Sequence, residues 1–492
     1  MSLEERQVRL EKLQRLQALG ILPYAVDPKR TTTCAETIES FDVWMQETRS
    51  LTLAGRLLTI RVHGGMMFAD LVDDSGKIQI TFKEDEIGTE EYARFRDLMD
   101  PGDVVEATGT LFLTRRGEKS LAVTSWRPLA KALLPLPEKW HGLQDVETRY
   151  RSRELDLLTN PEARERFLVR SRLVSSLRRF LDAARFLEVE TPMLHPIPGG
   201  ANARPFVTHH HALDADFYLR IAPELYLKRL IVGGFERVYE IGRCFRNEGI
   251  DHSHNPEFTM LELYWAYAER EPFMHFLETM IRTMVQEAVG SARVTLPDGE
   301  LSFQEPFPRK TFREAILEAT GIDVDSCPTK ESLETTVAAK GLRIDLSGCH
   351  GMGECLDELY KKTARPMIVQ PTWIMDYPAE LKPLANVSPE DPTKSACAQL
   401  VVCGAEVVNA YYHELHDPLL QRERLEEQEG LAAAGSHEAQ RLDEPFLEAL
   451  EHGMPPTSGV GIGIDRFVSL ITGAGVLKEV ILFPTLRPLT RE

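Results

Sequence analysis

Residues 245–265 read FRNEGIDHSHNPEFTMLELYW, and this stretch decides the fold of the larger part of the chain. It predicts a strand over 235–245, a polar loop, and a second strand over 257–265. Alternation along the second strand places Thr259, Leu261, Leu263 and Trp265 on an almost wholly apolar face that helices can cover. The opposite face carries Phe258, Met260, Glu262 and Tyr264. An aromatic surface beside a carboxylate and a phenol suits a flat base together with a cationic group.

The loop 246–255 and a glycine-rich segment further on both indicate a phosphate ligand. The loop holds an arginine, whose planar guanidinium matches phosphate geometry, together with two acids and two histidines. Residues 459–466 read GVGIGIDR, in which glycine at every second position predicts a strand with one bare face that a flat ligand can approach. Arg466 follows where we expect this strand to give way to a helix over 467–471. The chain contains no GxxxxGK[ST], so it is not a P-loop protein.

Length and composition indicate a multidomain globular protein. The chain has 492 residues, of which 43% are hydrophobic and 27% charged, with a net charge of −19. We expect no membrane span and no signal peptide, and therefore a cytoplasmic protein. Seven cysteines, spaced as at Cys349 and Cys355, fit neither a disulfide scaffold nor a zinc knuckle.

The first part of the chain predicts a small β-barrel. Five short strands over 51–130, with a helix over 89–99 after the third, match an OB fold. Such barrels bind single-stranded nucleic acid, and Phe68, Gln79 and Arg61 are candidates for base stacking, base-edge hydrogen bonding and phosphate contact. A helix in the first twenty residues either packs its leucines on the barrel or forms a basic arm that touches RNA. We expect an arm over 1–50, a linker over 131–160, and a second domain over 161–492 that opens with a helix over 161–186.

Several segments in a fixed order resemble the class II aminoacyl-tRNA synthetases. FRNEG (245–249) with HNPEFTMLELY (254–264) is similar to their motif 2, GIGIDR (461–466) to motif 3, and FLEVETP (186–192) to motif 1. GGANARPF (199–206) and APELYLKR (222–229) narrow the resemblance to the lysyl-tRNA synthetases of bacterial type, over essentially the whole chain. The resemblance implies an α+β multidomain protein in which an OB-fold barrel precedes a catalytic domain with a mainly antiparallel sheet flanked by helices. It also implies a homodimer formed through motif 1.

The resemblance further implies a ligase that activates L-lysine with ATP and transfers it to tRNA(Lys), with Mg²⁺ as cofactor. Arg246 would hold the α-phosphate and Arg466 the γ-phosphate, as the two catalytic residues. The remaining ATP contacts would be Glu248 to the adenine amino group, Phe258 to the adenine face, and His254 and Glu406 near the phosphates. The lysine-binding residues would be Gly200, Glu224, Glu262, Tyr264, Asn409, Tyr411 and Glu414. Arg61, Phe68 and Gln79 would read the anticodon.

This chain departs from the family pattern near the expected metal site. The family usually has a glutamate ligand where this chain has Gln399, and one additional residue stands between Asn409 and Glu414. Ser253 replaces a usual arginine. We expect Gln399 and Glu406 to hold Mg²⁺, with Glu406 as the main ligand, because an amide lacks charge. Alternation along one strand would place these two residues on opposite faces, so we also expect a bulge near Gly404.

Other functions compete with lysine activation. The departures fit a synthetase-like paralogue that binds tRNA and activates amino acids weakly or not at all. A related aspartyl or asparaginyl ligase is disfavoured because Glu262 and Glu414 suit a cation. The related enzyme that modifies elongation factor P is disfavoured because it lacks the N-terminal barrel.

Overall fold

The computed structural model describes residues 3–137, 143, 145–249, 251–297, 299–304, 306–349, 351–382, 384–433 and 440–489. The chain divides into two compact units, residues 1–144 and 145–492, each with its own hydrophobic core. Residues 138–142 and 144 of the predicted linker lie outside the described residues. In the described part, no helix has both the length and the apolar composition needed to cross a membrane.

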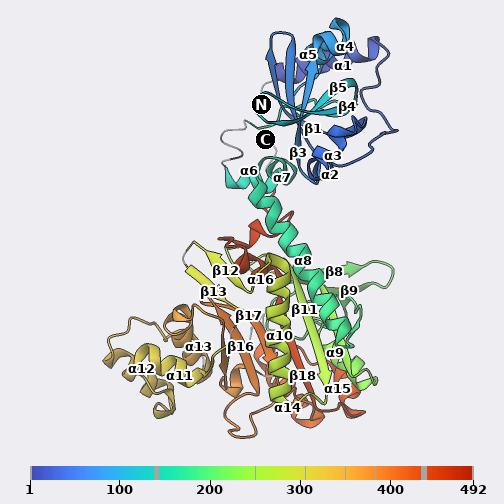
Figure 1. The fold of residues 1–492 in the computed structure, drawn as a ribbon. Helices are drawn as coiled ribbons and strands as arrows, with labels where there is room; N and C mark the ends of the chain where they lie inside the picture. Colours follow the sequence, from blue (N-terminus) through green and yellow to red (C-terminus); the bar gives the residue numbers. More distant parts are fainter. Residues whose placement is uncertain are drawn as a thin grey trace. The chain divides into compact units, whose positions relative to one another are not determined.

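The first unit is a closed five-stranded barrel of strand order β1-β2-β3-β5-β4, which confirms the predicted OB fold (Figure 1). Two helices follow the third strand, where a single one was expected. The strands and these helices are β1 (Leu51–His63), β2 (Met66–Val72), β3 (Lys77–Lys83), α4 (Glu84–Ile87), α5 (Thr89–Leu98), β4 (Val104–Leu113) and β5 (Lys119–Ala130).

The predicted arm is part of this unit. Its helices are α1 (Leu3–Ala18), α2 (Cys34–Glu39) and α3 (Phe41–Gln46), and Leu16, Cys34 and Phe41 are buried in the barrel core. Arg9 donates to the carbonyl of Pro101 and Lys12 pairs with Asp100 at 2.6 Å. Two of the basic side chains of α1 are therefore committed to the barrel, which favours the packing interpretation of this helix.

The predicted linker over 131–160 is shorter in the structure. At its start, the buried Lys131 ammonium lies 2.7 Å from Asp103 of the barrel unit. At its end, α6 (Val146–Arg151) and α7 (Arg153–Thr159) belong to the second unit, where the buried Arg153 donates to the carbonyl of Leu482. Polar and proline-rich composition indicated a linker, but these charged side chains are buried with partners.

The second unit is built on an eight-stranded sheet of order β14-β15-β16-β17-β18-β11-β10-β6. Its neighbouring strands are antiparallel except at the β14/β15 and β6/β10 pairs. The strands are β6 (Leu187–Glu188), β10 (Arg237–Phe245), β11 (Glu257–Ala266), β14 (Arg309–Thr311), β15 (Thr372–Met375), β16 (Cys397–Val402), β17 (Ala405–Tyr411) and β18 (Thr457–Gly463). The predicted strands around the motif 2 loop and at the glycine-rich segment are confirmed.

Two long helices cover one face of this sheet, α8 (Pro161–Ala183) and α10 (Arg270–Val289) (Figure 1). Leu261 and Leu263 of β11 are fully buried in the core between sheet and helices, as alternation along the strand predicts. The helix predicted over 161–186 ends at Ala183, and Arg185 takes a positive φ of 64°. The opposite face of β11 is therefore free to line a ligand cavity.

Further elements surround the sheet. Buried residues of α11, α12 and α13 form a separate core with Ile374 and Val401 at the β15–β16 side. The helices are α9 (Glu224–Val232), α11 (Phe312–Thr320), α12 (Lys330–Ala339), α13 (Met352–Lys362), α14 (Pro418–Ala433), α15 (Glu444–Glu451) and α16 (Ile464–Ile471), with the short η1 (Val324–Ser326), η2 (Arg365–Met367), η3 (Ala379–Leu381) and η4 (Leu477–Glu479). The small sheets contain β7 (Leu194–His195), β8 (Val207–His210), β9 (Ala215–Leu219), β12 (Arg293–Leu296) and β13 (Gly299–Ser302).

Candidate active site

A cavity of about 550 Å³ opens on the face of the sheet that α8 and α10 leave free. Phe258, Met260, Glu262 and Tyr264 of β11 all line it, as the alternation predicts. Gly461 lies beside this row on β18 and faces Glu262 across the strand pair. A glycine there leaves only backbone on that part of the floor, so a flat ligand can lie close to the sheet.

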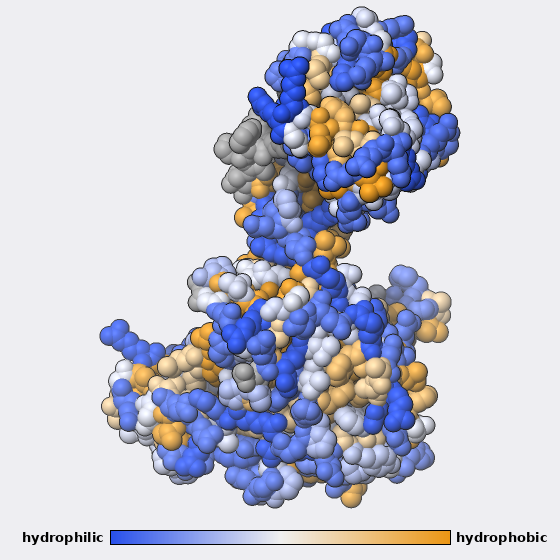
Figure 2. Space-filling view, viewed as in Figure 1, coloured by the Kyte–Doolittle hydropathy of each residue, from blue (hydrophilic) through white to orange (hydrophobic). Residues whose placement is uncertain are grey.

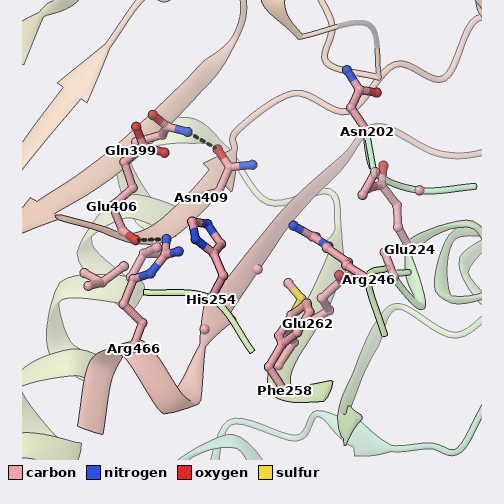
Figure 3. Close-up of a pocket in the computed structure, with 18 of the residues that line it drawn as sticks. Asn202, Glu224, Arg246, His254, Phe258, Glu262, Gln399, Glu406, Asn409 and Arg466 are labelled. Carbon is pink, nitrogen blue, oxygen red and sulfur yellow. Dashed lines mark hydrogen bonds between the residues drawn. The ribbon is translucent and has the colours of Figure 1, made fainter. Parts of the chain in front are cut away.

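One end of the cavity holds Arg466 beside Glu406, and Arg246 lies between this end and Glu262 (Figure 3). Arg246 follows β10, and its guanidinium carbon lies 5.1 Å from the centre of the Phe258 ring. α16 begins at Ile464, so Arg466 lies in its first turn and not before it as predicted. Asp465 accepts a hydrogen bond from the Thr259 backbone N–H at 2.7 Å, which holds α16 against β11. Burial, above all other causes, lowers the pKa of Arg466. Such arginines suit a polyphosphate.

Gln399 and Glu406 lie on paired strands, not on one strand. β16 and β17 form a hairpin whose two-residue turn is Cys403 and Gly404, with φ values of 48° and 71°. Positive φ at both positions is typical of the type I′ turn that matches strand twist. The register shifts opposite Leu400 and Val401, which leaves Val407 as the additional residue. The bulge expected near Gly404 is therefore wrong in position: Gly404 makes the turn, and the bulge at Val407 lets both Gln399 and Glu406 line the cavity.

The donor set around Gln399 and Glu406 does not fit a Mg²⁺ ion held by the protein. Glu406 Oε1 lies 3.1 Å from Arg365 Nη1, so its charge is already compensated. Gln399 donates to Asn409 Oδ1 at 3.3 Å and offers one buried, unpartnered but uncharged oxygen. Among the described residues, no group of three or more His, Cys, Asp or Glu side chains could hold a metal ion. Mg²⁺ favours anionic oxygen, which Gln399 lacks and which Glu406 already shares with Arg365.

The other end of the cavity carries buried carboxylates. Glu262 is only 4% exposed, and Tyr264 Oη donates to its Oε2 at 3.3 Å. Burial, with repulsion from Glu224 as the next cause, raises the pKa of Glu262 well above its ordinary value. An empty cavity therefore favours the protonated form of Glu262, and a cationic ligand would favour its ionised form.

Lys228 connects two further carboxylates. Its ammonium is fully buried, 2.7 Å from Glu224 Oε1 and 2.8 Å from Glu414 Oε2. Glu224 lines the cavity, whereas Glu414 is not among the lining residues. Burial raises the pKa of Glu414 to about 7, with Lys228 opposing and Glu224 adding to the shift. The structure thus places Glu414 against Lys228, where direct contact with a ligand was expected.

The remaining predicted contacts also line the cavity. Asn409 donates to Tyr411 Oη at 2.7 Å, and His254 Nδ1 lies 2.9 Å from Asp251. Gly200 has a φ of 88°, which favours glycine, and its N–H donates to Gln440. The predicted residues that line the cavity are Gly200, Glu224, Arg246, Glu248, His254, Phe258, Glu262, Tyr264, Gln399, Glu406, Asn409, Tyr411 and Arg466.

Sequence reasoning missed several residues of this site. Asn202 and Gln440 line the cavity and hydrogen-bond to each other, and Lys361 and Lys382 line it as well. Asn202 lies within the quoted segment 199–206, which could have drawn attention to it. Nothing in the local pattern distinguishes Lys361, Lys382 or Gln440, because only the tertiary fold brings them to the cavity.

The barrel brings its three candidate residues together on neighbouring strands. Arg61 of β1 faces Phe68 of β2 across the strand pair, and Gln79 of β3 accepts a hydrogen bond from Arg61 at 3.4 Å. Phe68 is half-buried, and His63 lies edge-on to its ring at 6.3 Å. Asp70 of β2 faces Gln79 across the strand pair and lies 3.5 Å from the Arg61 guanidinium. An aromatic ring beside a guanidinium and an amide forms the kind of surface that binds unpaired bases.

The comparisons with known proteins agree with this architecture. Residues 145–487 match the family "tRNA synthetases class II (D, K and N)", and residues 51–129 match "OB-fold nucleic acid binding domain". The chain therefore belongs to the class II tRNA synthetases. It is 49% identical to the Lysine--tRNA ligase of Roseiflexus castenholzii over 99% of both chains. It is also 49% identical to that of Moorella thermoacetica, over 98% of this chain and 97% of the relative. The predicted family and fold class are confirmed.

Lys228 gives a test of the buried charges. Lys228→Met keeps most of the volume but leaves Glu224 and Glu414 buried together without a cation. We expect the free energy of unfolding at pH 8 to fall by about 3–5 kcal/mol, the scale for breaking a buried ion pair. Burial already raises the pKa of Glu414, and loss of the opposing Lys228 would raise it further above that in the unfolded chain, so protonation restores stability as the pH falls. Urea unfolding at pH 8 and pH 5 should show the larger loss at pH 8.

Lys228→Met/Glu414→Gln is the matched control, because it removes one of the two unpaired charges. We expect this double variant to regain part of the stability at pH 8. Equal losses at both pH values would mean that the carboxylates do not depend on Lys228.

Proposed function

We propose that this protein is a lysine–tRNA ligase, which activates L-lysine with ATP and transfers the lysyl group to tRNA(Lys). The observation that carries the proposal is one cavity lined by two arginines, Arg246 and Arg466, and by the buried carboxylates Glu224 and Glu262. Relatives that are 49% identical over nearly the full chain, each named Lysine--tRNA ligase, support it. The proposed activity and the proposed substrate, lysine, both rest on these cavity residues and on these relatives.

The carboxylate end is the proposed lysine subsite. Glu262 and Tyr264 would receive the ε-ammonium, whose charge compensates the carboxylate that burial otherwise protonates. Glu224 and Gly200 would bind the α-amino end, and Asn409 with Tyr411 would complete the wall. Glu414 acts through Lys228, which it holds against Glu224. An amino acid without the ammonium leaves Glu262 buried and unpaired, and this cost provides selectivity.

The arginine end is the proposed ATP subsite. Phe258 and the bare backbone of Gly461 would enclose the adenine, and Glu248 would accept a hydrogen bond from the adenine amino group. Arg246 would bind the α-phosphate and Arg466 the γ-phosphate, with His254 near the end of the triphosphate. ATP brings Mg²⁺ with it as part of the substrate. These assignments rest on the positions of the side chains around the cavity (Figure 3).

The residues assemble the reactants and need no protein nucleophile. A carboxylate oxygen of lysine attacks the α-phosphorus, a P–O bond forms, and pyrophosphate leaves. Arg246 stabilises the charge on the equatorial oxygens, and the two ends of the cavity hold the reactants in line. A ribose hydroxyl at the 3′ end of tRNA then attacks the lysyl carbonyl and AMP leaves. The rate comes from positioning and charge compensation.

The barrel is the proposed anticodon reader. Phe68 would stack on a base, Gln79 would hydrogen-bond to a base edge, and Arg61 would contact phosphate or sugar. Arg9 and Lys12 of α1 are engaged within the protein, so we assign the first helix to the barrel and not to RNA binding.

We also propose a homodimer formed through motif 1, residues 186–192. Leu187, Met193, Leu194 and Val207, in and near this segment, are each between 44% and 59% exposed. The surface of the second unit is largely hydrophilic but carries hydrophobic patches (Figure 2). Covering them in a dimer would remove apolar surface from water. A cytoplasmic location follows from the proposed substrates, tRNA and ATP.

ATP–pyrophosphate exchange, measured with each amino acid in turn, tests the function. We expect exchange with lysine and near-background rates with aspartate and asparagine, because only lysine supplies a cation for Glu262. Arg246→Ala, purified in the same way, should lose the activity and thereby exclude a contaminating host ligase. Exchange with another amino acid would contradict the proposal. tRNA binding without any exchange would favour the paralogue.

Phe68→Ala tests the division of labour. We expect tRNA binding to weaken by about 1–3 kcal/mol, the scale of one base stacked on an aromatic ring. Lysine-dependent exchange without tRNA should stay unchanged, since the cavity lies wholly within the other unit. Tyr24→Ala, which removes an exposed aromatic outside these strands, is the control and should bind tRNA normally. A parallel loss of exchange in Phe68→Ala would contradict the assignment.

A further inference from the structure

We propose that Arg365 takes the place of a metal ion at the Gln399–Glu406 position, so that the only Mg²⁺ this active site uses is the one that ATP brings. This inference rests on the proposed function for the identity of the nucleotide. It assigns Arg365 as a positioning residue: its permanently charged guanidinium compensates Glu406 beside the proposed triphosphate subsite.

The fold places Arg365 against the tip of the β16–β17 hairpin. The Cys403 N–H donates to the carbonyl of Val369 at 2.9 Å, and the Gly404 N–H donates to Ile368 at 2.8 Å. A Cβ on Gly404 would lie 3.2 Å from Pro366 Cα, so the turn fits closely against the segment that carries Arg365. These backbone contacts hold Arg365 near Glu406 independently of the ion pair. The pairing is therefore a built feature of the fold.

The charges at this position oppose a second cation. Because Gln399 is neutral, Glu406 supplies the carboxylate of this pair of residues, and Arg365 lies against one of its oxygens. Arg466 donates to the backbone carbonyl of Glu406 at 2.9 Å, which brings a second guanidinium to the same residue. Lys361 and Lys382 add further positive charge to the cavity wall. A divalent ion would enter among like charges and find a neutral amide and a compensated carboxylate as donors.

The substitution has a chemical consequence for the reaction. A bound metal ion dissociates when its free concentration falls, whereas a guanidinium is always present and always charged. Charge compensation at this point of the phosphate chain is then independent of free Mg²⁺. The enzyme should then need Mg²⁺ only to form the Mg²⁺–ATP complex that binds as substrate. This differs from the expectation drawn from sequence, in which Gln399 and Glu406 hold Mg²⁺ with Glu406 as the main ligand.

Counting bound Mn²⁺ by electron paramagnetic resonance tests the proposal without relying on turnover. The samples contain the full chain, a non-hydrolysable ATP analogue and Mn²⁺ in place of Mg²⁺. We expect the wild type to bind about as many Mn²⁺ ions as nucleotides, because the ion arrives with ATP. Arg365→Ala/Gln399→Glu, which frees Glu406 and restores a second carboxylate, should bind about one more Mn²⁺ per chain. Adding Glu406→Gln to this double variant should remove the additional ion.

Two controls keep the result interpretable. Arg365→Lys retains a positive charge and should bind Mn²⁺ like the wild type, and thermal unfolding checks that each variant is folded. If the double variant does not fold, Gln399→Glu with Arg365→Gln replaces it. A wild-type chain that binds the additional ion, or a folded double variant that does not, overturns the proposal. Lysine-dependent exchange by the same wild-type preparation tests the proposed function separately, since Mn²⁺ counting requires only nucleotide binding.

Discussion

The buried Lys228 ammonium sets the charge of the cavity. It lies within 2.8 Å of both Glu224 and Glu414, so one cation serves two carboxylates. Among the described residues Glu262 has no ion pair of this kind, and its burial raises its pKa well above the ordinary value although Arg246 and Lys228 oppose the shift. The deficit of positive charge at this end is what an amino acid with a side-chain ammonium would fill.

The sheet joins this acidic end to a basic one. β11 carries Glu262 and Phe258 on the same face, four residues apart, and β18 lies beside it with glycines in place of side chains. The opposite face of β11 is packed under α8 and α10, which fixes the strand that orients both ends. In the proposed function, the arginines bind the phosphates and the glutamates bind the amine, so that the two reactants would lie in one line. The proposed mechanism needs nothing more from the protein than this arrangement.

Much of this arrangement could be predicted from local patterns. Period-two alternation correctly assigned the two faces of β11, and the glycines of 459–463 indicated a strand with a bare face. The barrel was predictable because its five strands lie within one continuous stretch of the chain, interrupted only by the helices after the third strand. The partner of Glu414 was not predictable from the sequence, since Lys228 precedes Glu414 by 186 residues and only the fold brings the two together. For the same reason the Arg365–Glu406 pair carries no local signal. Alternation indicated a bulge between Gln399 and Glu406, but it did not show that a turn at Cys403 and Gly404 places the bulge at Val407.

Calorimetric titration with lysine, in buffers of different ionisation enthalpy at pH 8, tests the central claim most directly. Burial raises the pKa of Glu262 in the empty cavity and an ammonium beside it would lower that pKa, so we expect lysine binding to release protons and the affinity to rise with pH. Glu262→Gln should release markedly fewer protons, whereas Glu257→Gln, an exposed glutamate on the same strand, should behave like the wild type. Equal proton release by the wild type and Glu262→Gln, or no release at all, would contradict the account.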